Sequence, residues 1–506
     1  MTDDLIRPLG SEHEDFLRDE SRQNGEAQSI SFPANSDNIS EIIREIRRTG
    51  STITTQGART GIVAGAVPQS GHILNLSRMK QIQKPVNTSE CYTTMIVQPG
   101  ALLDEIRETA AEYNLMFPPD PTETTASIGG MVAANASGSM SFLYGATRKW
   151  VTALEIILGD GDTLSLTRGK HFANKRHFNL TTNGGRTISS NLPDYTIPHV
   201  KSAAGYYIAD DMDMIDLFIG MEGTLGIISQ IELKLIPKPA AFCGLTVFLP
   251  NEESALKLVR ILRGESIQDI EPIAFRPAAI EYFNSDALNL LRNAKANYPA
   301  FEKIPALKPE YHSAIYTEFH GESDEQLEEI VMLVMEALTE LGGSDDNTWF
   351  ATNARELEPL KAFRHATPEA VNLLIDQRKR SEPKLTKLGT DMSVPDSHLE
   401  QIMDIYNKGL SDANLESVIF GHIGNNHLHV NIIPKTMDDY AKGKELYLSW
   451  AKKVIEFGGS ISAEHGIGKL KAPFLELMYG REAIEQMQSL KKLFDPDNIL
   501  NPGNLF

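Results

Sequence analysis

The sequence predicts an α+β fold divided over more than one domain. At 506 residues the chain is too long for one ordinary hydrophobic core. Up to about residue 239, short β-rich runs are separated by Gly-rich turns and a few helices, whereas residues 240–455 alternate strands with amphipathic helices. Pro237 and Pro239 mark the boundary between these two parts. We therefore expect domains at 1–239 and 240–455, followed by a C-terminal segment at 456–506.

The first part opens with an amphipathic helix at residues 36–50. Its isoleucines recur at helical spacing, and Gly50 is a suitable residue to end it. A Gly-Asp-Gly-Asp turn joins two of the β-runs that follow, which predicts a hairpin. The further elements expected here are strands at 52–55, 151–158, 163–166 and 226–236, and a helix at 102–113.

The second part contains the most informative hairpin. Residues 417–433 read SVIFGHIGNNHLHVNII, with β-rich ends around a Gly-Asn-Asn centre. A turn centred on Asn425 and Asn426 places His422 opposite His429 and Gly424 opposite His427. Opposed residues have Cβ atoms roughly 4.5–5.5 Å apart, close enough for two imidazoles to share one metal ion. The other elements expected in the remainder of the chain are strands at 245–249 and 313–319 and helices at 252–263, 325–341 and 482–494.

Composition excludes some classes of function. The net charge of −20 gives the chain no electrostatic reason to bind nucleic acid or an anionic membrane surface. Cys91 and Cys243 lie far apart without metal-ligand spacing, which favours a reducing compartment over a disulfide framework. The start of the chain lacks an apolar signal segment, and no run is long enough to span a bilayer. We expect a cytoplasmic protein, with docking at the membrane periphery left open.

Three clusters of small residues occur in the first part. In the first, Gly57, Gly61 and Gly65 would let consecutive backbone amides form an anion-binding nest, although an ordinary tight turn reads the same way. In the second, 126–139, the density of Gly, Ser and Asn suits a flat cofactor pressed against backbone; a tightly packed core helix is the alternative. The third, 222–228, is a Gly-punctuated turn entering a strand and says little alone.

A metal site is the strongest chemical signal. His422 and His429 flank the predicted turn, and Glu464 follows in a Gly-rich loop with His465 beside it. Two histidines and a carboxylate, with positions left open for substrate, make a catalytic divalent site. Hydrogen-bonded structural histidines are the alternative. Asn431 lies two residues beyond His429, on the same face of the strand.

In this order the clusters resemble the FAD-binding family that includes vanillyl-alcohol oxidase and p-cresol methylhydroxylase (PCMH). More narrowly, the chain resembles the branch of D-lactate, glycolate and D-2-hydroxyglutarate dehydrogenases. The resemblance runs from about Pro33 to the end, where Phe494-Asp495-Pro496 and Ile499–Gly503 are typical of the branch. It implies a PCMH-type FAD-binding domain of two subdomains, a cap domain with an antiparallel sheet, and a C-terminal helical segment that returns to the FAD domain.

The same resemblance implies the residues that hold a non-covalent FAD. The pyrophosphate would lie on the first Gly-rich loop, the ribityl chain and isoalloxazine ring along the small-residue segment, and the adenosine near the third cluster. In that order the residues are Gly57, Arg59, Thr60 and Gly61; then Pro119, Asp120, Ser127, Gly130, Asn135, Ser137 and Gly138; then Glu222, Gly226 and Ile228; and finally Asn501, which would approach the flavin from the tail.

The resemblance also implies roles around the substrate. His422, His429 and Glu464 match the metal ligands and His465 the catalytic base. Zinc suits such ligands, although manganese, iron or cobalt could serve. The substrate-binding residues implied are Arg364, Lys387 and Asn431, the first two for the carboxylate.

One departure from the branch lies between the ligand histidines. Its usual pattern there is Gly-Asp-Gly-Asn, whereas this chain has Gly424, Asn425, Asn426 and His427. The ligand spacing is unchanged, so the metal site is still expected. The role of His427 stays open among a further ligand, a group behind the ligands and a substrate contact.

These observations predict an FAD- and metal-dependent dehydrogenase of small D-2-hydroxy acids, such as D-lactate or D-2-hydroxyglutarate. His465 would take the hydroxyl proton while hydride passes to the flavin. The electron acceptor would be an electron-transfer flavoprotein, a quinone or a cytochrome, and the protein a homodimer. The alternatives are a non-redox enzyme like the alkyl-glycerone-phosphate synthases, a subunit of a glycolate oxidase, and an unrelated enzyme with a structural metal site.

Overall fold

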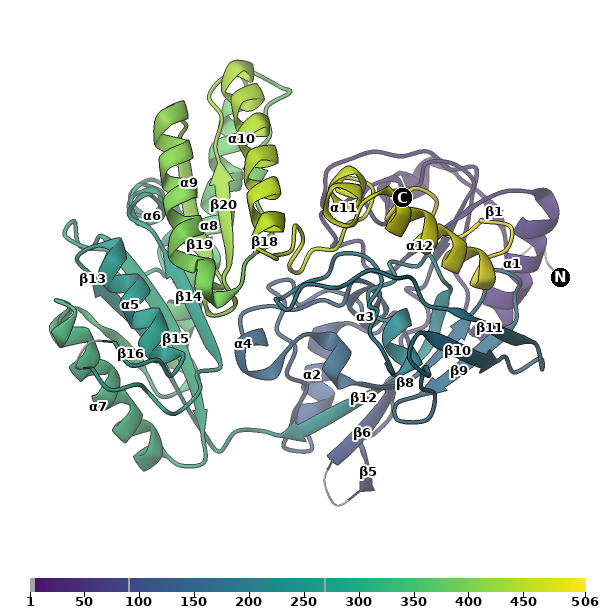
Figure 1. The fold of residues 1–506 in the computed structure, drawn as a ribbon, viewed down its shortest axis with the longest axis horizontal. Helices are drawn as coiled ribbons and strands as arrows, with labels where there is room; N and C mark the ends of the chain where they lie inside the picture. Colours follow the sequence, from purple (N-terminus) through teal and green to yellow (C-terminus); the bar gives the residue numbers. More distant parts are fainter. Residues whose placement is uncertain (1–4, 90–91, 268–269) are drawn as a thin grey trace.

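The computed structural model describes residues 5–89, 92–267 and 270–506. Figure 1 shows two bodies side by side. The first body holds the chain up to β12 (Ile227–Pro237), and the second runs from β13 (Ala241–Leu249) to α10 (Met437–Glu456). The last segment, with α11 (Ala472–Tyr479) and α12 (Arg481–Phe494), lies back on the first body. The predicted α+β class is confirmed.

A small sheet at the N-terminus supports the first Gly-rich loop. Its order is β1-β2-β4-β3, with β2 and β3 both parallel to β4. Helix α1 (Ser36–Thr49) buries its isoleucines against this sheet, begins at the Asn35 cap and ends at Gly50 with φ 68°, as predicted. The strands are β1 (Arg7–Pro8), β2 (Ser29–Ser31), β3 (Ile53–Gln56) and β4 (His72–Asn75), and a 3-10 turn, η2, covers Ser11–Leu17.

A larger antiparallel sheet completes the first body. Its order is β5-β6-β12-β8-β9, and β7 adds to one end of β12. The predicted hairpin of β8 and β9 is present, closed by Leu158 N–H donating to Asp162 O at 2.8 Å. The strands are β5 (Val86–Ser89), β6 (Tyr92–Val97), β7 (Leu115–Met116), β8 (Val151–Ile157) and β9 (Thr163–Thr167); the separate hairpin is β10 (His177–Thr181) with β11 (Thr187–Asn191); the helices are α2 (Leu103–Ala111), α3 (Ile128–Ala134) and α4 (Ser141–Tyr144).

The second body is one antiparallel sheet between two layers of helices. Its order is β16-β13-β15-β14-β19-β20-β17, with β18 paired to β20. Strand alternation assigns the faces: Ile280 and Tyr282 join the core with α5 and α7, whereas Ala279 and Phe283 join that of α6 and α8. The strands are β14 (Ala279–Phe283), β15 (Ser313–Gly321), β16 (Trp349–Ala351), β17 (Leu388–Gly389), β18 (Met392–Ser393), β19 (Ser417–Gly421) and β20 (His427–Ile432); the helices are α5 (Glu252–Leu262), α6 (Ser285–Asn297), α7 (Asp324–Glu340), α8 (Ala354–Arg378) and α9 (Leu399–Ala413).

The hairpin of β19 and β20 is present, but its predicted register is wrong. Phe420, not His422, lies opposite His429. The connection spans residues 422–426 instead of two residues, since a 3-10 turn occupies Ile423–Asn425 and Asn426 closes it with φ 51°. Gly424 therefore lies in the turn and faces no strand partner. The shift of two residues keeps His429 on the same face of the sheet.

Two further predictions concern composition. Cys91 lies outside the described residues, and Cys243 is a buried free thiol. Within the described ranges, no helix is both long and apolar enough to cross a bilayer.

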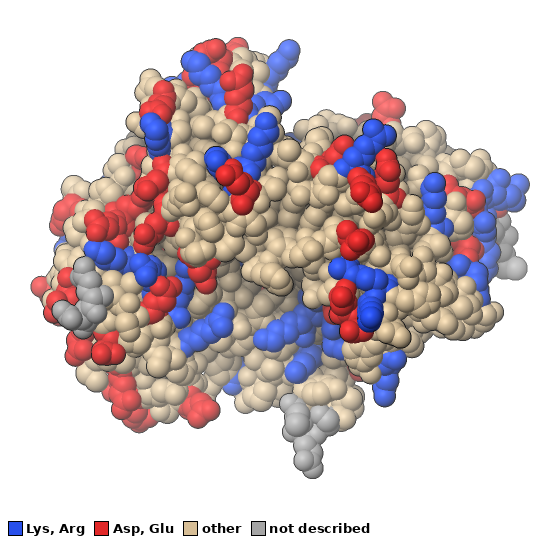
Figure 2. Space-filling view, viewed as in Figure 1, with Lys and Arg blue, Asp and Glu red and all other residues tan. Residues whose placement is uncertain are grey.

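Figure 2 shows Asp and Glu side chains gathered over the outer part of the second body, while Lys and Arg side chains lie on both sides of the junction between the bodies. The net negative charge is thus unevenly distributed over this face.

Candidate active site

Three histidines and a glutamate converge between the two bodies. His422 follows β19 directly, His427 and His429 lie on one face of β20, and Glu464 comes from the loop after α10. One ligand atom from each lies within 4.8 Å of the others. Gly421 allows this approach: with φ 122°, it carries no side chain where a Cβ would lie 2.8 Å from the His429 ring. The spacing and chemistry of these atoms suit a bound cation.

Each ring has one nitrogen turned to an oxygen outside the cluster. In His422, Nδ1 lies 2.6 Å from Oε1 of Glu281 on β14. In His429, Nδ1 lies 3.2 Å from the Thr390 carbonyl oxygen. Glu281 was not among the predicted site residues, although a carboxylate inside the mostly apolar run 279–283 is a usable signal in the sequence.

Asp391 fixes the loop that carries Glu464 and His465. Its carboxylate accepts the amides of both residues, at 3.2 and 3.1 Å, and pairs with Lys471 at 2.6 Å. The same carboxylate lies 2.9 Å from Nε2 of His427. Burial alone would raise the pKa of Asp391, but the His465 ring and Lys471 ammonium hold it well below its usual value. Asp391 is therefore an anion that ties this loop to β20.

Glu464 presents its two oxygens to different partners. Oε1 faces Nε2 of His422 at 3.2 Å, whereas Oε2 accepts from Lys201 Nζ at 2.6 Å and from Ser137 Oγ at 3.2 Å. Burial would raise the pKa of Glu464, but the Lys201 ammonium and the His422 ring hold it well below its usual value. Nothing in the local sequence pattern singles out Lys201, since it lies in an irregular stretch between elements.

His465 is the most accessible imidazole of the site. Its side chain is 27% exposed, compared with 14% for His429 and 0% for His427. Its ring stacks on that of His429 with centroids 5.5 Å apart. Nδ1 lies 3.4 Å from Asp391 Oδ2, and Nε2 lies 3.6 Å from Glu464 Oε1. The ring is thus anchored at one nitrogen and adjacent to the cluster at the other.

Arg364 from α8 brings a buried cation to the site. Its guanidinium lies 3.8 Å from Asp120 and 4.0 Å from Glu281, and among the described residues it makes no hydrogen bond. Its donors remain available for an anion. Asn431 continues the His427–His429 face of β20 opposite Gly389. Lys387 is not brought to the cluster by any contact within the described residues; burial lowers its pKa, with Arg22 as the neighbouring charge.

The first Gly-rich loop provides a cradle for an anion. Among the described residues, none of the backbone amides from Arg59 to Gly65 donates a hydrogen bond within the protein. The loop faces open space, since a Cβ added at Gly61 would meet nothing within 4 Å. Gly57 is needed for packing, because a Cβ there would lie 2.0 Å from Ser127 Oγ. The predicted residues Arg59, Thr60 and Gly61 therefore fit a bound diphosphate.

The small-residue segment lies between that loop and the cluster. Ser127 begins α3 and accepts the Ala58 amide at 3.2 Å, and Gly130 is exposed on the same helix. Gly138 passes so close to Asp120 that a Cβ would lie 1.7 Å from its carbonyl oxygen. The Pro119 carbonyl and the Asp120 carboxylate both accept from Arg107, each at 2.8 Å, which fixes the turn. Ser137, as described, reaches Glu464.

Four of the predicted cofactor residues have left-handed backbone conformations. Arg59, Asn135, Glu222 and Asn501 have φ of 62°, 49°, 53° and 43°. Non-glycine residues rarely adopt such angles, and strain of this kind gathers at ligand sites. The three small-residue clusters and the tail therefore each contain a residue whose backbone fits close contact with a cofactor.

Glu222 lies against the Glu464 loop. Its carboxylate accepts the amides of Ile467 and Gly468 at 2.7 and 2.6 Å, and burial raises its pKa to about 7. Asn501 links this turn to β3, donating to Glu222 O at 3.1 Å and accepting from Thr55 N at 2.9 Å. Gly226 and Ile228, the other predicted residues of this cluster, lie buried where β12 begins beside β8.

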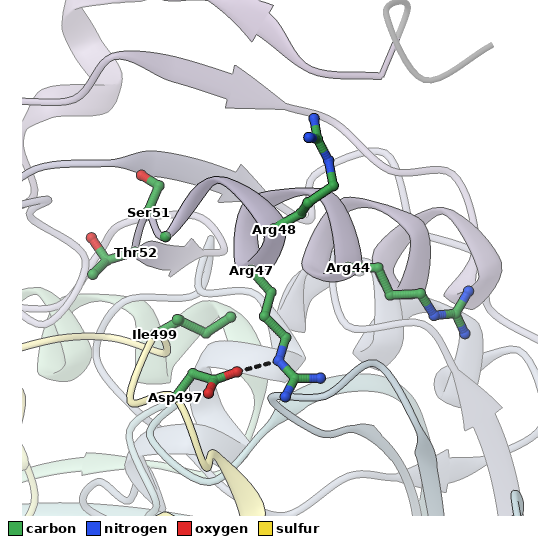
Figure 3. Close-up of a pocket in the computed structure, with 8 residues that line it drawn as sticks. Arg44, Arg47, Arg48, Ser51, Thr52, Asp497 and Ile499 are labelled. Carbon is green, nitrogen blue, oxygen red and sulfur yellow. Dashed lines mark hydrogen bonds and ion pairs between the residues drawn. The ribbon is translucent and has the colours of Figure 1, made fainter.

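A separate cavity of about 540 Å³ lies away from these residues (Figure 3). It is lined by Arg44, Arg47 and Arg48 from the C-terminal half of α1 and by Asp497 from the tail. Arg47 pairs with Asp497, and Arg48 pairs with Glu45 at 2.6 Å. Since none of the predicted site residues lines this cavity, we assign it no part in the chemistry.

Comparisons with known proteins agree with this arrangement. A family profile described as FAD linked oxidases, C-terminal domain, matches residues 238–505, and one described as FAD binding domain matches residues 27–167. The chain is 28% identical to D-lactate dehydrogenase of Anaerostipes hadrus, over 97% of this chain and 93% of that protein. It is 29% identical to glycolate oxidase subunit GlcD of Bacillus subtilis, over 94% and 88%. A D-2-hydroxyglutarate dehydrogenase of Xanthomonas citri is 28% identical, over 94% and 89%.

Solved structures give the same fold. An alkyldihydroxyacetonephosphate synthase superposes with a TM-score of 0.65 at 15% identity, covering 99% of this chain and 82% of that chain. At this identity the likeness concerns the fold alone.

Proposed function

The chain belongs to the family of FAD-linked oxidases and is an FAD-dependent oxidoreductase, and from this premise we propose that it oxidises a small D-2-hydroxy acid to the 2-oxo acid with the help of a divalent metal. One observation carries the proposal. Ser137, in the segment expected to line the flavin, donates to Glu464, which belongs to the cluster expected to hold the metal. Redox cofactor and substrate-activating groups would therefore meet at one place.

The proposal assigns a role to each part of the chain. Residues 1–239 would bind FAD through the residues named above, residues 240–455 would cover the substrate, and residues 456–506 would carry Glu464 and His465 back to the FAD domain. FAD would supply the hydride acceptor. A divalent ion on His422, His429 and Glu464, zinc being well suited, would lower the pKa of a coordinated hydroxyl.

The protein's own groups would then bind the acid and move its proton. Arg364 has unpaired donors in a planar fork that matches a carboxylate. Asn431 would offer an amide beside the cluster, and Lys387 could contribute only after moving toward it. His465 would take the hydroxyl proton, because its ring is the most accessible and Asp391 stabilises the imidazolium that forms.

The names of relatives suggest the substrates, since D-lactate, glycolate and D-2-hydroxyglutarate all carry a 2-hydroxyl beside a carboxylate. The proposal extends to a cytoplasmic homodimer that passes its electrons to an electron-transfer flavoprotein, a quinone or a cytochrome. Such an acceptor is required because each turnover leaves two electrons on the protein.

Anaerobic mixing of the purified flavoprotein with single 2-hydroxy acids tests the function. We expect one D-acid or glycolate to bleach the flavin, its L-enantiomer, where one exists, to leave it unchanged, and prior chelation to abolish the bleaching. An exposed-histidine control, His177→Asn, should bleach as the parent does. If no 2-hydroxy acid reduces the bound flavin, the dehydrogenase proposal is wrong. That result would favour the alternative of a non-redox enzyme like the alkyl-glycerone-phosphate synthases. If bleaching survives complete metal removal, the metal has no role in it.

A further inference from the structure

We propose that His427 is a third imidazole ligand, so that the cation is held by three histidines and Glu464. The inference rests on the proposed function for the presence of a metal. It concerns the position at which the dehydrogenase branch that this chain resembles has asparagine. In this chain the residue is a histidine with no exposed surface, inside the cluster.

All three rings have one nitrogen directed at the cluster and the other beside an oxygen outside it. Nδ1 of His422 and Nδ1 of His429 are hydrogen-bonded to Glu281 and to the Thr390 carbonyl, whereas Nε2 of His427 lies 2.9 Å from Asp391 Oδ1 without the geometry of a hydrogen bond. A neutral imidazole has one N–H, so a ring whose outer nitrogen donates keeps a lone pair on its inner nitrogen for a metal. His422 also turns its inner Nε2 to Glu464 Oε1 at 3.2 Å, so a bound ion would replace the proton shared there. An acceptor behind each ring is the usual support of ligand histidines.

The inner nitrogens all point at Glu464. Nε2 of His422 and Nε2 of His429 lie 3.2 and 3.8 Å from Oε1, and Nδ1 of His427 lies 3.9 Å from Oε2. Ligands of one ion with bonds of about 2.1 Å lie no more than about 4.2 Å apart. One ligand atom from each of the four residues lies within 4.8 Å of the others, so a shift of roughly half an ångström would let one ion reach all of them.

Lys201 reveals the lone pair of His427. Its Nζ lies 3.3 Å from Nδ1 of His427 and 2.6 Å from Oε2 of Glu464. An ammonium can only donate, so Nδ1 of His427 must be the acceptor. The cluster thus already places a positive charge against the two atoms that a third-histidine site would use, and a metal bound there would take over this contact from Lys201.

A third imidazole has consequences for the choice of ion. Three neutral nitrogens and one carboxylate favour first-row transition ions over magnesium and calcium, which prefer oxygen ligands. An ion that takes six ligands would keep two positions, enough for the hydroxyl and one carboxylate oxygen of a 2-hydroxy acid. A four-coordinate ion would be closed to the substrate, so we expect the working ion to expand beyond four ligands.

Counting imidazoles on the bound ion tests the inference without relying on activity. The stripped flavoprotein would be loaded with Zn²⁺ and examined by X-ray absorption at the zinc edge, and its affinity measured by competition with a chelator. We expect three imidazoles in the parent and two in His427→Asn. The affinity should fall by more than the roughly 100-fold that loss of an outer partner costs. His177→Asn should match the parent, and His422→Asn should lose an imidazole in the same way.

The outcomes separate this inference from the proposed function. Two imidazoles in the parent, with unchanged affinity in His427→Asn, would overturn the third ligand and leave the metal-dependent dehydrogenase intact. A parent that takes up no zinc although FAD is bound would overturn both. If His427→Asn does not retain FAD, the variant is treated as misfolded. The number of imidazoles on the zinc of the parent protein then decides the question alone.

Discussion

At the scale of single residues, the four histidines of the site differ in what holds them. His422, His427 and His429 each have an acceptor behind the ring and face Glu464, whereas His465 stacks on His429 and keeps more than a quarter of its surface exposed. Burial lowers the pKa of His427 to about 4 and holds that of His429 well below its usual value. In His422 burial is outweighed by the carboxylates of Glu281 and Glu464, which raise its pKa. The neutral rings of His427 and His429 suit ligation, and an accessible ring suits proton transfer.

The role of His465 gives the first residue-scale prediction. His465→Asn should slow flavin reduction by the substrate about 100-fold or more, because its ring is the most exposed of the four histidines at the cluster. FAD content and zinc uptake should stay at parental levels, since Asp391 would still hold the loop through its backbone amides. Stopped-flow bleaching of the variant measures the effect. A rate within a few-fold of the parent would remove His465 from the role of base.

Arg364 gives the second residue-scale prediction. Arg364→Lys keeps the buried charge but loses the planar fork, so the concentration of hydroxy acid that half-saturates bleaching should rise roughly 10- to 100-fold, as expected for a lost charge-assisted hydrogen bond. The exposed Arg380→Lys, in the turn that follows α8, is the matched control. An unchanged half-saturation in Arg364→Lys would mean that the carboxylate binds elsewhere, with Lys387 as the next candidate.

The sequence could predict the metal residues but not their surroundings. The spacing of His422 and His429 and the Glu-His pair point to a shared ion, and the structure brings these residues together. The role of His427 depends on where Asp391 lies, which requires the pairing of β18 with β20. Lys201 carries no pattern at all in the sequence. Contacts between residues so distant along the chain are set by the tertiary fold, which local periodicity does not encode.

At the scale of elements, helix ends are predictable because caps are local. Asn35 and Gly50 delimit α1 as expected. The register of the hairpin of β19 and β20 could not be predicted from the sequence. The length of its connection depends on Gly421 and Asn426 adopting positive φ. A two-residue turn and a five-residue connection both fit the letters Gly-Asn-Asn. The hairpin of β10 and β11 is missing from the sequence predictions because its short alternating runs lie within a polar stretch.

Strand β4 gives a prediction on stability and pH. His72 is fully buried in this strand, bonded to Ser29 Oγ at 2.8 Å, and burial lowers its pKa to about 4 from the ordinary 6.5. Between these values the unfolded chain binds a proton that the folded protein refuses, so stability falls as the pH drops below about 6.5. The loss at pH 5 should be about 2 kcal/mol relative to pH 7.5.

Urea unfolding of the parent and His72→Asn at both pH values measures this loss. The variant should lose about 2 kcal/mol less than the parent on acidification, because it has no proton to gain at this site. His177→Asn, at an exposed position of strand β10, should behave as the parent does. Equal pH dependence in the parent and His72→Asn would show that the ring takes up its proton without unfolding.

At the scale of the whole molecule, the site exists only where three segments meet. Glu464 contacts Ser137 and Lys201 from the first body and His422 from the second, residues 327, 263 and 42 positions away along the chain. Its loop is held from one side by Asp391 and from the other by Glu222. The positive groups Lys201, Arg364 and Lys471 gather at this meeting point, so an anionic substrate can be bound by a chain of net charge −20.

This arrangement predicts that the metal stabilises the assembled molecule and not only the hairpin. An ion that binds the folded state alone adds about 2.7 kcal/mol at a free concentration one hundred times its Kd. Since its ligands lie in the hairpin of β19 and β20 and in the loop after α10, unfolding of either segment would release it. Chelation should therefore lower the Tm of the flavoprotein by a few degrees, and zinc should restore it. His429→Asn should start at a lower Tm and respond more weakly to both treatments, because it has lost one ligand, with FAD content measured in each sample to exclude loss of the flavin as the cause. A chelator-insensitive Tm in protein shown to contain zinc would place the ion outside these segments, because an ion held by both of them cannot leave the folded state without cost.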